Sequence, residues 1–413
     1  MHMRMSELQF DLIRREVAAL QGKSAFYKKK YEGIDVGSLL SREDFEKLPF
    51  ISKEDLRDAY PMGLAAVPQE QIVRIHSTSG TTGIPVVIPY TAKDVEDFAI
   101  IMERCLRYAG VTKEDIVHIT PGYGLNSSGI GFQAGVERLG AMALPIGPGN
   151  TDKQLKMMMD VGSTAIGATA SYALVLAEEI AKRGIRDKIK LRTGLIGSER
   201  CGQKMRERIR NELGIEYHEL YGLTEIYGPG VAVSCKHDCG MHYWDDYFYA
   251  EIIDPVTGKV LPDGETGELV FTTLHKEGAP LIRYRTHDLT RIIPGDCPCG
   301  SRYPRIDTIL GRTDDMVKIK GVGIFPGQVD CMLAEIPLAS SEFRMVVDRD
   351  AGKDVCLLEV EIVPGADPED AETILRRAFK QKMGIYVEVK AFPVGTLPRS
   401  EGKTKRVIDK REY

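Results

Sequence analysis

The sequence predicts an α/β protein, with a large layered α/β domain that carries a β-rich subdomain, followed by a small α+β domain. Three observations lead to this prediction. The chain has 413 residues, more than one hydrophobic core usually supports. Between Arg74 and Tyr221, short apolar runs alternate with amphipathic stretches, and the next segment has the turn-rich pattern of antiparallel strands. Beyond Gly311 and Arg312 the chain is strand-rich and charged, so we expect domains over residues 1–312 and 313–413.

Each element follows from its local pattern. The residues before Pro68 predict helices joined by short turns. In the alternating region we expect strands at Ile72–Ile75, Val86–Ile88, Ile116–Ile119, Ala141–Leu144, Ala165–Ile166 and Gly194–Ile196, and helices at Asp94–Tyr108, Thr151–Val161, Ser171–Arg183 and Gln203–Leu213. Antiparallel strands are expected at Ala250–Ile253, Glu268–Phe271 and Leu289–Ile292, and a helix at Asp367–Met383.

Composition excludes several classes of protein. The net charge is -5 and basic residues are dispersed, which argues against a nucleic-acid partner. The uncharged run Val161–Ala177 is better explained by a buried strand and helix than by a membrane span. The first twenty residues, about the length of a signal peptide, do not read as one. Eight cysteines without such a signal indicate reduced thiols, metal ligands or both, so we expect a cytoplasmic protein without a membrane partner.

The most informative segment is a loop rich in hydroxyls and glycines between two predicted strands. Glycines let the backbone approach an anion, and successive N–H groups and hydroxyls can donate to phosphate oxygens. An ordinary surface loop has a similar composition, and the segment matches neither a Walker loop nor a dinucleotide fingerprint. The candidate phosphate-binding residues are Ser77, Thr78, Ser79, Gly80, Thr81, Thr82 and Gly83.

This loop, followed by Ile84 and Pro85, resembles the phosphate loop of the adenylate-forming superfamily, which contains acyl-CoA synthetases and nonribosomal-peptide adenylation domains. Most of that superfamily has a lysine just after the proline. This chain has Val86 and Val87 there, which resembles the phenylacetate-CoA ligase family. The resemblance extends from Leu48 to Arg406, with the motifs in the family's order.

Further motifs carry the resemblance, and it implies a role for each. In Tyr221-Gly222-Leu223-Thr224-Glu225, the tyrosine stacks on adenine, Thr224 contacts the α-phosphate and Glu225 helps to hold Mg²⁺. Ser198 and Glu199 occupy the place of the adenine-side loop, although Arg200 departs from the proline often found there. Asp288, in Tyr-Arg-Thr-His-Asp, holds the ribose hydroxyls of ATP.

The resemblance also implies a mobile C-terminal domain. Arg312 reaches the nucleotide, Asp314 is the hinge, and the segment ending at Lys320 and Gly321 is presented to coenzyme A after rotation. Lys403 matches a mobile lysine that bridges the carboxylate and the α-phosphate. Without the resemblance, the segment around Lys403 would be a solvated basic tail.

Two cysteine-rich segments resemble a structural zinc site. Clustered Cys and His with a Cys-x-Cys knuckle closed by glycine are typical of such sites. Similar arrangements in some phenylacetate-ligase relatives imply the ligands Cys235, His242, Cys297 and Cys299. A set that uses Cys239 or His237, or no metal at all, remains open.

The implied function is an AMP-forming ligase that activates an aryl carboxylic acid with Mg²⁺-ATP and transfers it to coenzyme A. Tyr123 and Asn126 occupy the segment that lines the acyl pocket in the family. Because Asn126 replaces the family's aromatic ring with an amide, an aromatic acid with a polar substituent fits at least as well as phenylacetate. Three alternatives are adenylation of a deazaflavin hydroxyl, acyl transfer to a carrier protein, and a non-catalytic nucleotide sensor, which would need neither Glu225 nor Lys403. Relatives often dimerise, so a homodimer is a further expectation.

Overall fold

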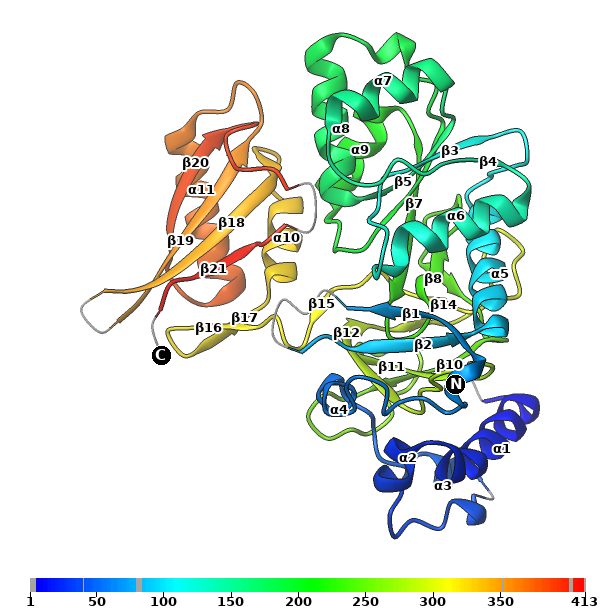
Figure 1. The fold of residues 1–413 in the computed structure, drawn as a ribbon. Coiled ribbons are helices and arrows are strands. Elements are labelled where there is room, and N and C mark those ends of the chain that lie inside the picture. The colour runs from blue at the N-terminus through cyan, green and yellow to red at the C-terminus, as the bar shows by residue number, and fades with distance from the viewer. Residues whose placement is uncertain (1–4, 40, 79–83, 351–352, 401–403, 412–413) are drawn as a thin grey trace.

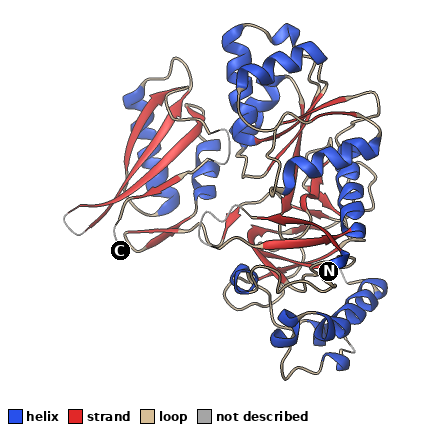
Figure 2. Cartoon of the chain, viewed as in Figure 1, coloured by secondary structure: helices blue, strands red, loops and turns tan. Residues whose placement is uncertain are grey.

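The structure is a computed structural model that describes residues 5–39, 41–78, 84–350, 353–400 and 404–411. It has a large N-terminal body of helices and sheets and a smaller α+β body at the C-terminal end (Figure 1). Strands and helices alternate through the upper part of the large body, strands cross its middle, and helices lie at its lower end (Figure 2). The predicted fold class is confirmed.

The N-terminal segment is helical and packs beneath the β-rich part of the large domain (Figure 1). Helix α1 begins after Ser6, whose hydroxyl accepts from the N–H of Gln9 while the Gln9 side chain accepts from the N–H of Ser6. The elements are α1 (Glu7–Lys23), α2 (Ala25–Lys30), η1 (Val36–Ser38), α3 (Arg42–Phe45), α4 (Lys53–Asp58) and η2 (Gln69–Gln71).

The largest sheet among the described residues has the order β13-β14-β9-β8-β7-β6-β5-β3-β4. Strands β3 to β7 pair in parallel, and the remaining neighbours are antiparallel. Its strands are β3 (Ile116–Ile119), β4 (Met142–Leu144), β5 (Ala165–Thr169), β6 (Thr193–Gly197), β7 (Glu216–Leu223), β8 (Gly228–Ser234), β9 (Met241–Tyr243), β13 (Ile292–Ile293) and β14 (Arg305–Ile306).

Helices connect the parallel strands, as βαβ crossovers require. They are α6 (Ser127–Leu139), α7 (Thr151–Val161), α8 (Ala170–Arg183), η3 (Arg186–Lys188) and α9 (Gln203–Leu213). Helix α5 (Ala92–Tyr108) leads from β2 into β3. Close packing of α6 on α5 depends on glycine: a Cβ on Gly131 would lie 2.3 Å from the Phe98 ring. Helices α5, α7, α8 and α9 begin and end within a few residues of their predicted bounds, whereas α6 was not predicted.

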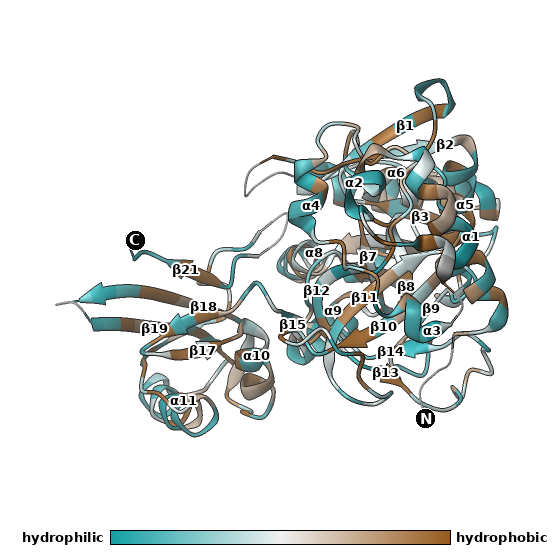
Figure 3. Ribbon diagram, turned by 90° about the horizontal axis from the view of Figure 1, so that it is seen from below, coloured by the Kyte–Doolittle hydropathy of each residue, from teal (hydrophilic) through white to brown (hydrophobic). Residues whose placement is uncertain are grey.

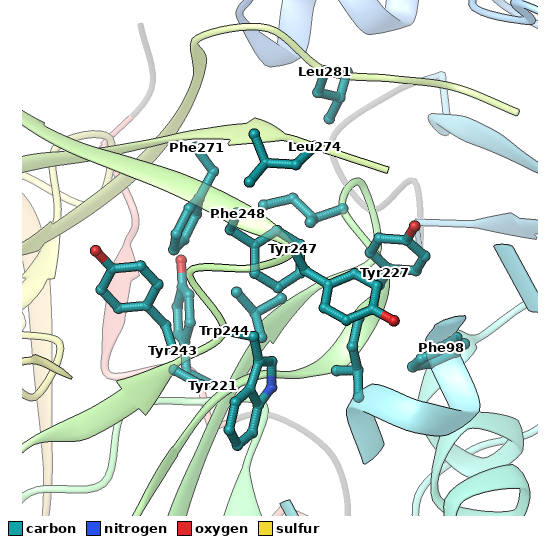
Figure 4. Packing of buried hydrophobic residues seen from close by; sticks show 14 of the residues in the cluster. Phe98, Tyr221, Tyr227, Tyr243, Trp244, Tyr247, Phe248, Phe271, Leu274 and Leu281 are labelled. Atoms are coloured by element: carbon teal, nitrogen blue, oxygen red, sulfur yellow. The ribbon is translucent and has the colours of Figure 1, made fainter. Parts of the chain in front are cut away.

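The β-rich part of the large domain consists of a hairpin and a second sheet. The hairpin pairs β1 (Ile72–Ser77) with β2 (Val87–Thr91), and the sheet has the order β10 (Phe248–Ile253), β11 (Gly267–Thr273), β12 (Tyr284–Thr290) and β15 (Gly311–Arg312). Aromatic side chains fill the space between these strands and the large sheet, including Trp244, Phe248 and Phe271 (Figure 4). This core fixes the β12 strand against β7.

The small domain has a hydrophobic core of its own, which begins at Val317. Its elements are β16 (Val317–Ile319), β17 (Val322–Ile324), α10 (Pro326–Ala334), β18 (Ala339–Asp350), β19 (Lys353–Ile362), α11 (Pro368–Met383), β20 (Glu388–Pro393) and β21 (Val407–Asp409). Helix α10 has no counterpart among the predicted elements, since Pro326 and Gly327 open it and it lacks a strong helical pattern.

The proposed boundary after Arg312 falls between two hydrophobic cores, because β15 still pairs with β12 while Val317 belongs to the small domain. Seen from below, the small domain lies beside the large one as a separate body (Figure 3). In the described part of the chain, every helix is too short or too polar to cross a bilayer.

Candidate functional site

The predicted nucleotide-binding motifs gather at the carboxyl ends of the parallel strands β5, β6 and β7. In the sheet register, Thr169 lies opposite Gly197, and Gly197 lies opposite Leu220. Ser198 and Glu199 follow β6 directly, and β7 runs into the Tyr221–Glu225 motif. This edge of an open parallel sheet is where α/β proteins bind ligands.

Asp288 stands at the centre of one cluster. The Tyr221 hydroxyl donates to its Oδ2 at 2.6 Å, and Nη1 of Arg312 donates to its Oδ1 at 3.1 Å. Burial raises the pKa of the Asp288 carboxyl, and the Arg312 guanidinium opposes that rise. Three residues predicted to surround the nucleotide therefore lie together, and the Tyr221 hydroxyl orients the carboxylate.

Glu225 forms a second cluster with a residue that the sequence analysis did not single out. Its carboxylate is buried, and Oε1 lies 3.1 Å from Nζ of Lys53 at the start of α4. The hydroxyls of Thr224 and Ser127 lie 3.3 Å apart beside this pair. Glu225 and Thr224 thus lie on the same side of the site as the ammonium group of Lys53.

Lys53 reaches this place because the chain before α4 pairs with β12. The N–H of Ile51 donates to the Arg283 carbonyl at 3.1 Å, and the N–H of Arg285 donates to the Ile51 carbonyl at 2.9 Å. No local sequence pattern indicates this contact, since the partners lie far apart in the sequence. Only the order of the motifs hints that the segment after Leu48 belongs to the site.

Gly222 has a steric reason to lack a side chain. A Cβ at this position would lie 2.1 Å from the carbonyl oxygen of Gly228 on the neighbouring strand β8. The glycine therefore lets β7 and β8 approach at the point where Tyr221 and Thr224 leave the sheet.

The phosphate loop is partly described. Ser77 ends β1, and the Thr78 hydroxyl accepts from the N–H of Val86 at 3.0 Å, while the N–H of Thr78 donates to the Val86 carbonyl at 3.0 Å. The predicted strands on both sides of the loop pair as a hairpin. Ser79, Gly80, Thr81, Thr82 and Gly83 lie outside the described residues.

The adenine-side loop contacts the C-terminal segment. Ser198 has a φ of 69°, a backbone conformation that is uncommon for residues other than glycine. Glu199 accepts from the N–H of Ser171 through Oε1 at 2.7 Å and from the N–H of Thr404 through Oε2 at 2.9 Å. Lys403, the predicted mobile lysine, lies outside the described residues, and Thr404 follows it in the sequence.

The predicted hinge is tied to the nucleotide cluster. Asp314 accepts two hydrogen bonds from Arg312, each 2.8 Å long. Lys320 and Gly321 form the turn between β16 and β17 with φ values of 50° and 83°, as a type I′ hairpin turn requires. Nζ of Lys320 donates to the Tyr386 carbonyl at 2.8 Å, so the side chain of this predicted CoA-binding residue is held within the small domain.

The two predicted acyl-pocket residues differ in environment. Tyr123 is half-buried, its hydroxyl has no hydrogen-bond partner in the described part of the chain, and burial raises its pKa to about 12. Asn126 is exposed, and its Oδ1 accepts from the N–H of Ser128 at 2.8 Å as the N-cap of α6. The identity of Asn126 thus has a local structural explanation, and its part in the acyl pocket stays a proposal.

The four predicted zinc ligands lie in one cluster. One ligand atom from each of Cys235, His242, Cys297 and Cys299 lies within 4.8 Å of all the others. Nδ1 of His242 is 2.7 Å from the Tyr303 carbonyl, which leaves Nε2 facing Cys299 Sγ at 3.4 Å. A donor set of three thiols and one imidazole with the other ring nitrogen held by a carbonyl fits tetrahedral zinc.

The alternative ligands are placed differently. Cys239 Sγ lies 3.3 Å from Cys297 Sγ, but it also accepts from Nη1 of Arg305 at 3.1 Å and is not within the four-residue group. His237 is exposed on the loop between β8 and β9. The geometry therefore favours Cys235, His242, Cys297 and Cys299 as the ligands, and it excludes Cys239 and His237 from that group.

Comparison with known families matches both domains. Residues 16–275 match the AMP-binding enzyme family, and residues 321–411 match the AMP-binding enzyme C-terminal domain. The two matches follow each other in the order expected for the two domains.

Solved structures also match over nearly the whole chain. A 2-hydroxyisobutyryl-CoA ligase in the postadenylation state with 2-HIB-AMP is 27% identical and has a TM-score of 0.88, covering 99% of this chain and 90% of that one. The same ligase with 2-HIB-AMP and CoA in the thioesterification state is 28% identical but has a TM-score of 0.71, covering 98% and 90%. Because both structures are of one ligase, we infer that the domains of this chain are arranged as in its postadenylation state.

Curated relatives match at higher identity. A phenylacetate-coenzyme A ligase of Pseudomonas putida is 41% identical, with 98% of this chain and 93% of the relative covered. A phenylacetate-coenzyme A ligase of Thermus thermophilus is 38% identical, with 99% and 97% covered. The family predicted from the sequence is thereby confirmed, and the chain belongs to the phenylacetate-coenzyme A ligase family of AMP-binding enzymes.

Proposed function

We propose that this protein is an AMP-forming ligase that activates an aryl carboxylic acid with ATP and transfers the acyl group to coenzyme A. The single observation that carries this proposal is the pair of clusters at the strand ends, Asp288 with Tyr221 and Arg312, and Glu225 with Lys53. The first offers an oriented carboxylate for a ribose diol. The second offers charged groups for the phosphates and for Mg²⁺.

In the first half-reaction, the substrate carboxylate attacks the α-phosphorus of ATP and pyrophosphate leaves. Asp288 accepts hydrogen bonds from the ribose hydroxyls, and Thr224 donates to the α-phosphate. Glu225 would hold Mg²⁺, because a hard cation prefers carboxylate oxygen, and the bound ion would neutralise phosphate charge. By the family resemblance, Lys403 would offset the repulsion between the two anions that must approach each other.

In the second half-reaction, the thiol of coenzyme A attacks the acyl carbon and AMP leaves. The small domain rotates about Asp314, which withdraws Lys403 and presents the hairpin turn at Lys320 and Gly321. Both half-reactions need water to be kept away, since an acyl-adenylate is readily hydrolysed.

The acid is phenylacetate or an aromatic acid with a polar substituent. Tyr123 supplies an aromatic wall, and its buried hydroxyl has no partner in the described part of the chain, so it keeps a hydrogen bond that a polar group on the substrate could receive. Asn126 is committed to capping α6, and we assign it a lesser part in selectivity than Tyr123.

The cysteine and histidine cluster is proposed as a structural zinc site. Cys235 directly follows β8, His242 lies on β9, and Cys297 and Cys299 lie between β13 and β14. Four protein ligands would leave no position for a substrate. The ion would then join the segments at one edge of the large sheet.

The experiment that tests this function measures AMP and pyrophosphate release with a panel of aryl acids, with and without coenzyme A. We expect acid-dependent pyrophosphate release and a CoA-dependent thioester, with phenylacetate among the substrates. AMP transfer to a deazaflavin, thioester formation only on a carrier protein, or nucleotide binding without turnover would each contradict the proposal and indicate one of the three alternatives.

A further inference from the structure

The two domains meet through ion pairs and hydrogen bonds, and their hydrophobic cores remain separate. The small domain faces α8, α9 and the loop after β6 (Figure 1). Polar interfaces of this kind permit domains to separate and rearrange. The contacts include Arg200 with Asp330, Nζ of Lys204 with the Ile336 and Ala339 carbonyls, and Arg208 with Ser341.

Arg399 is held by one carboxylate from each domain. Within the small domain, Nη1 and Nη2 donate to Glu361 at 2.9 and 2.8 Å, and the Glu361 side chain is fully buried. Across the interface, Nε and Nη2 donate to Glu178 on α8 at 3.0 and 2.8 Å. Glu361 can therefore fix the Arg399 side chain in any domain orientation, whereas Glu178 reaches it only when the domains are docked as observed.

The surroundings of Glu178 keep its carboxylate charged for its partner Arg399. Burial acts to raise its pKa, but hydrogen bonds from Arg399 and Arg208 outweigh that effect and hold the pKa below its ordinary value. Its side chain is 24% exposed, and that of Arg399 is 15% exposed. A charge-assisted bidentate pair at such a partly desolvated site is stronger than a surface ion pair.

A second carboxylate of the large domain, Glu199, binds the residue that follows Lys403. Glu199 accepts the N–H of Thr404, and the hydroxyls of Thr404 and Ser171 lie 2.5 Å apart. In sequence, Arg399 precedes Lys403 and Thr404 follows it. Both described flanks of the segment that carries Lys403 thus bind carboxylates of the large domain.

We propose that Glu178 and Glu199 are positioning residues for adenylation, which hold Arg399 and Thr404, the described residues on either side of Lys403, against the large domain. This inference rests on the proposed function. Because the contacts form in the orientation that resembles a postadenylation state, they stabilise that state and must break before thioester formation. A contact present in only one of two states shifts the equilibrium toward that state.

The test separates the two half-reactions in the full-length protein. Glu178→Gln keeps the shape of the side chain but removes its charge. We expect ATP–pyrophosphate exchange with phenylacetate to fall about tenfold, the scale of a hydrogen bond to a charged group. Single-turnover transfer from preformed phenylacetyl-AMP to coenzyme A should be unchanged or faster.

Glu179→Gln is the matched control. Glu179 follows Glu178 on α8, but it is paired with Lys182 and Arg183 within the helix. We expect both half-reactions to match those of the wild-type protein. Thermal unfolding of each variant would check that the large domain remains folded.

Two results would overturn the inference: an unchanged exchange rate in Glu178→Gln, or an equal loss of exchange and transfer, which indicates a general structural role. A wild-type protein that catalyses neither half-reaction with any aryl acid would instead refute the proposed function. The two failures are therefore distinguishable.

Discussion

The nucleotide clusters and the domain interface use similar charged residues in different settings. At the nucleotide clusters, Asp288 and Glu225 are buried. Their partners, Arg312 and Lys53, both belong to the large domain. At the interface, Glu178 and Glu199 are only partly buried and bind groups of the small domain. The first arrangement lies within the large domain, whereas the second joins the two domains, so we expect only the second to break when the small domain rotates.

This difference separates the two halves of the proposed reaction. Residues that hold the nucleotide are needed for both half-reactions, because the adenylate stays bound between them. Residues at the interface are needed only while Lys403 serves adenylation. Removing one member of a buried pair also leaves the other uncompensated, which costs more than losing a partly exposed contact.

The largest effect on both half-reactions together is expected for Asp288→Asn. The amide cannot accept from Arg312, Tyr221 and a ribose diol together, so both half-reactions should fall by about 100-fold. Exchange and single-turnover transfer measure the two steps. Asp307→Asn, which alters a partly exposed pair with Arg291, is the control. A loss confined to exchange would break the comparison, because Asp288 would then behave like an interface residue.

Removal of the proposed zinc should lower the stability of the fold. The ratio of the rates of the two half-reactions should stay unchanged. We expect Cys297→Ser to lose one equivalent of zinc and to lower Tm by roughly 5 to 10 °C. Cys239→Ser should keep the metal, because Cys239 lies outside the four-residue group. Metal analysis and thermal unfolding provide the measurements. Zinc retained in Cys297→Ser but lost in Cys239→Ser would assign the ligands differently.

Lys276 provides a pH-dependent test of the core beside the nucleotide clusters. It is fully buried, with Nζ 3.3 Å from the centre of the Tyr90 ring, and burial lowers its pKa to about 7, although Asp94 and Asp97 oppose this. Above pH 7 the unfolded chain binds a proton that the folded protein does not. Stability should therefore rise with pH from about 7 to about 10, by at most about 1.4 kcal/mol per unit.

Lys276→Met should flatten this dependence, whereas the exposed Lys259→Met should keep it. Denaturant titrations between about pH 7.5 and 9.5 span the rising part of the curve. An identical pH dependence in Lys276→Met and the wild-type protein would show that Lys276 remains charged in the folded state.

The smallest effect is expected for Tyr123→Phe, which removes a hydroxyl that lacks a partner in the described residues. The preference for a hydroxylated phenylacetate over phenylacetate should fall about fivefold, because only the polar substrate can use the hydroxyl. The ratio of kcat/KM for the two acids measures it. Tyr386→Phe, at an exposed position in the small domain, is the control, and an unchanged ratio would remove Tyr123 from the acyl pocket.

Local patterns predicted most of the elements, because periodicity and capping act over a few residues. Asp367, for example, is the first residue of the predicted helix and caps α11. Lys53 could not be predicted, since it meets Glu225 only after the chain before α4 pairs with β12. Asn126 was interpreted through the family pattern alone, and its capping role became visible only with α6 in place.

Glu178 was missed for a related reason. Its helix was predicted closely, but an acidic residue on an amphipathic helix normally indicates a solvated face. Only the docked small domain, with Arg399 fixed by Glu361, gives this carboxylate a partner. Contacts between domains depend on their relative orientation, which local sequence patterns do not encode.

The separation of the two half-reactions is tested most directly by Lys403→Ala, compared with Asp288→Asn in the same assays. We expect Lys403→Ala to lose ATP–pyrophosphate exchange with phenylacetate but to transfer the acyl group from preformed phenylacetyl-AMP to coenzyme A at the wild-type rate. Asp288→Asn should be impaired in both. Exchange at the wild-type rate in Lys403→Ala, or an equal loss of both half-reactions, would contradict this division between the two regions.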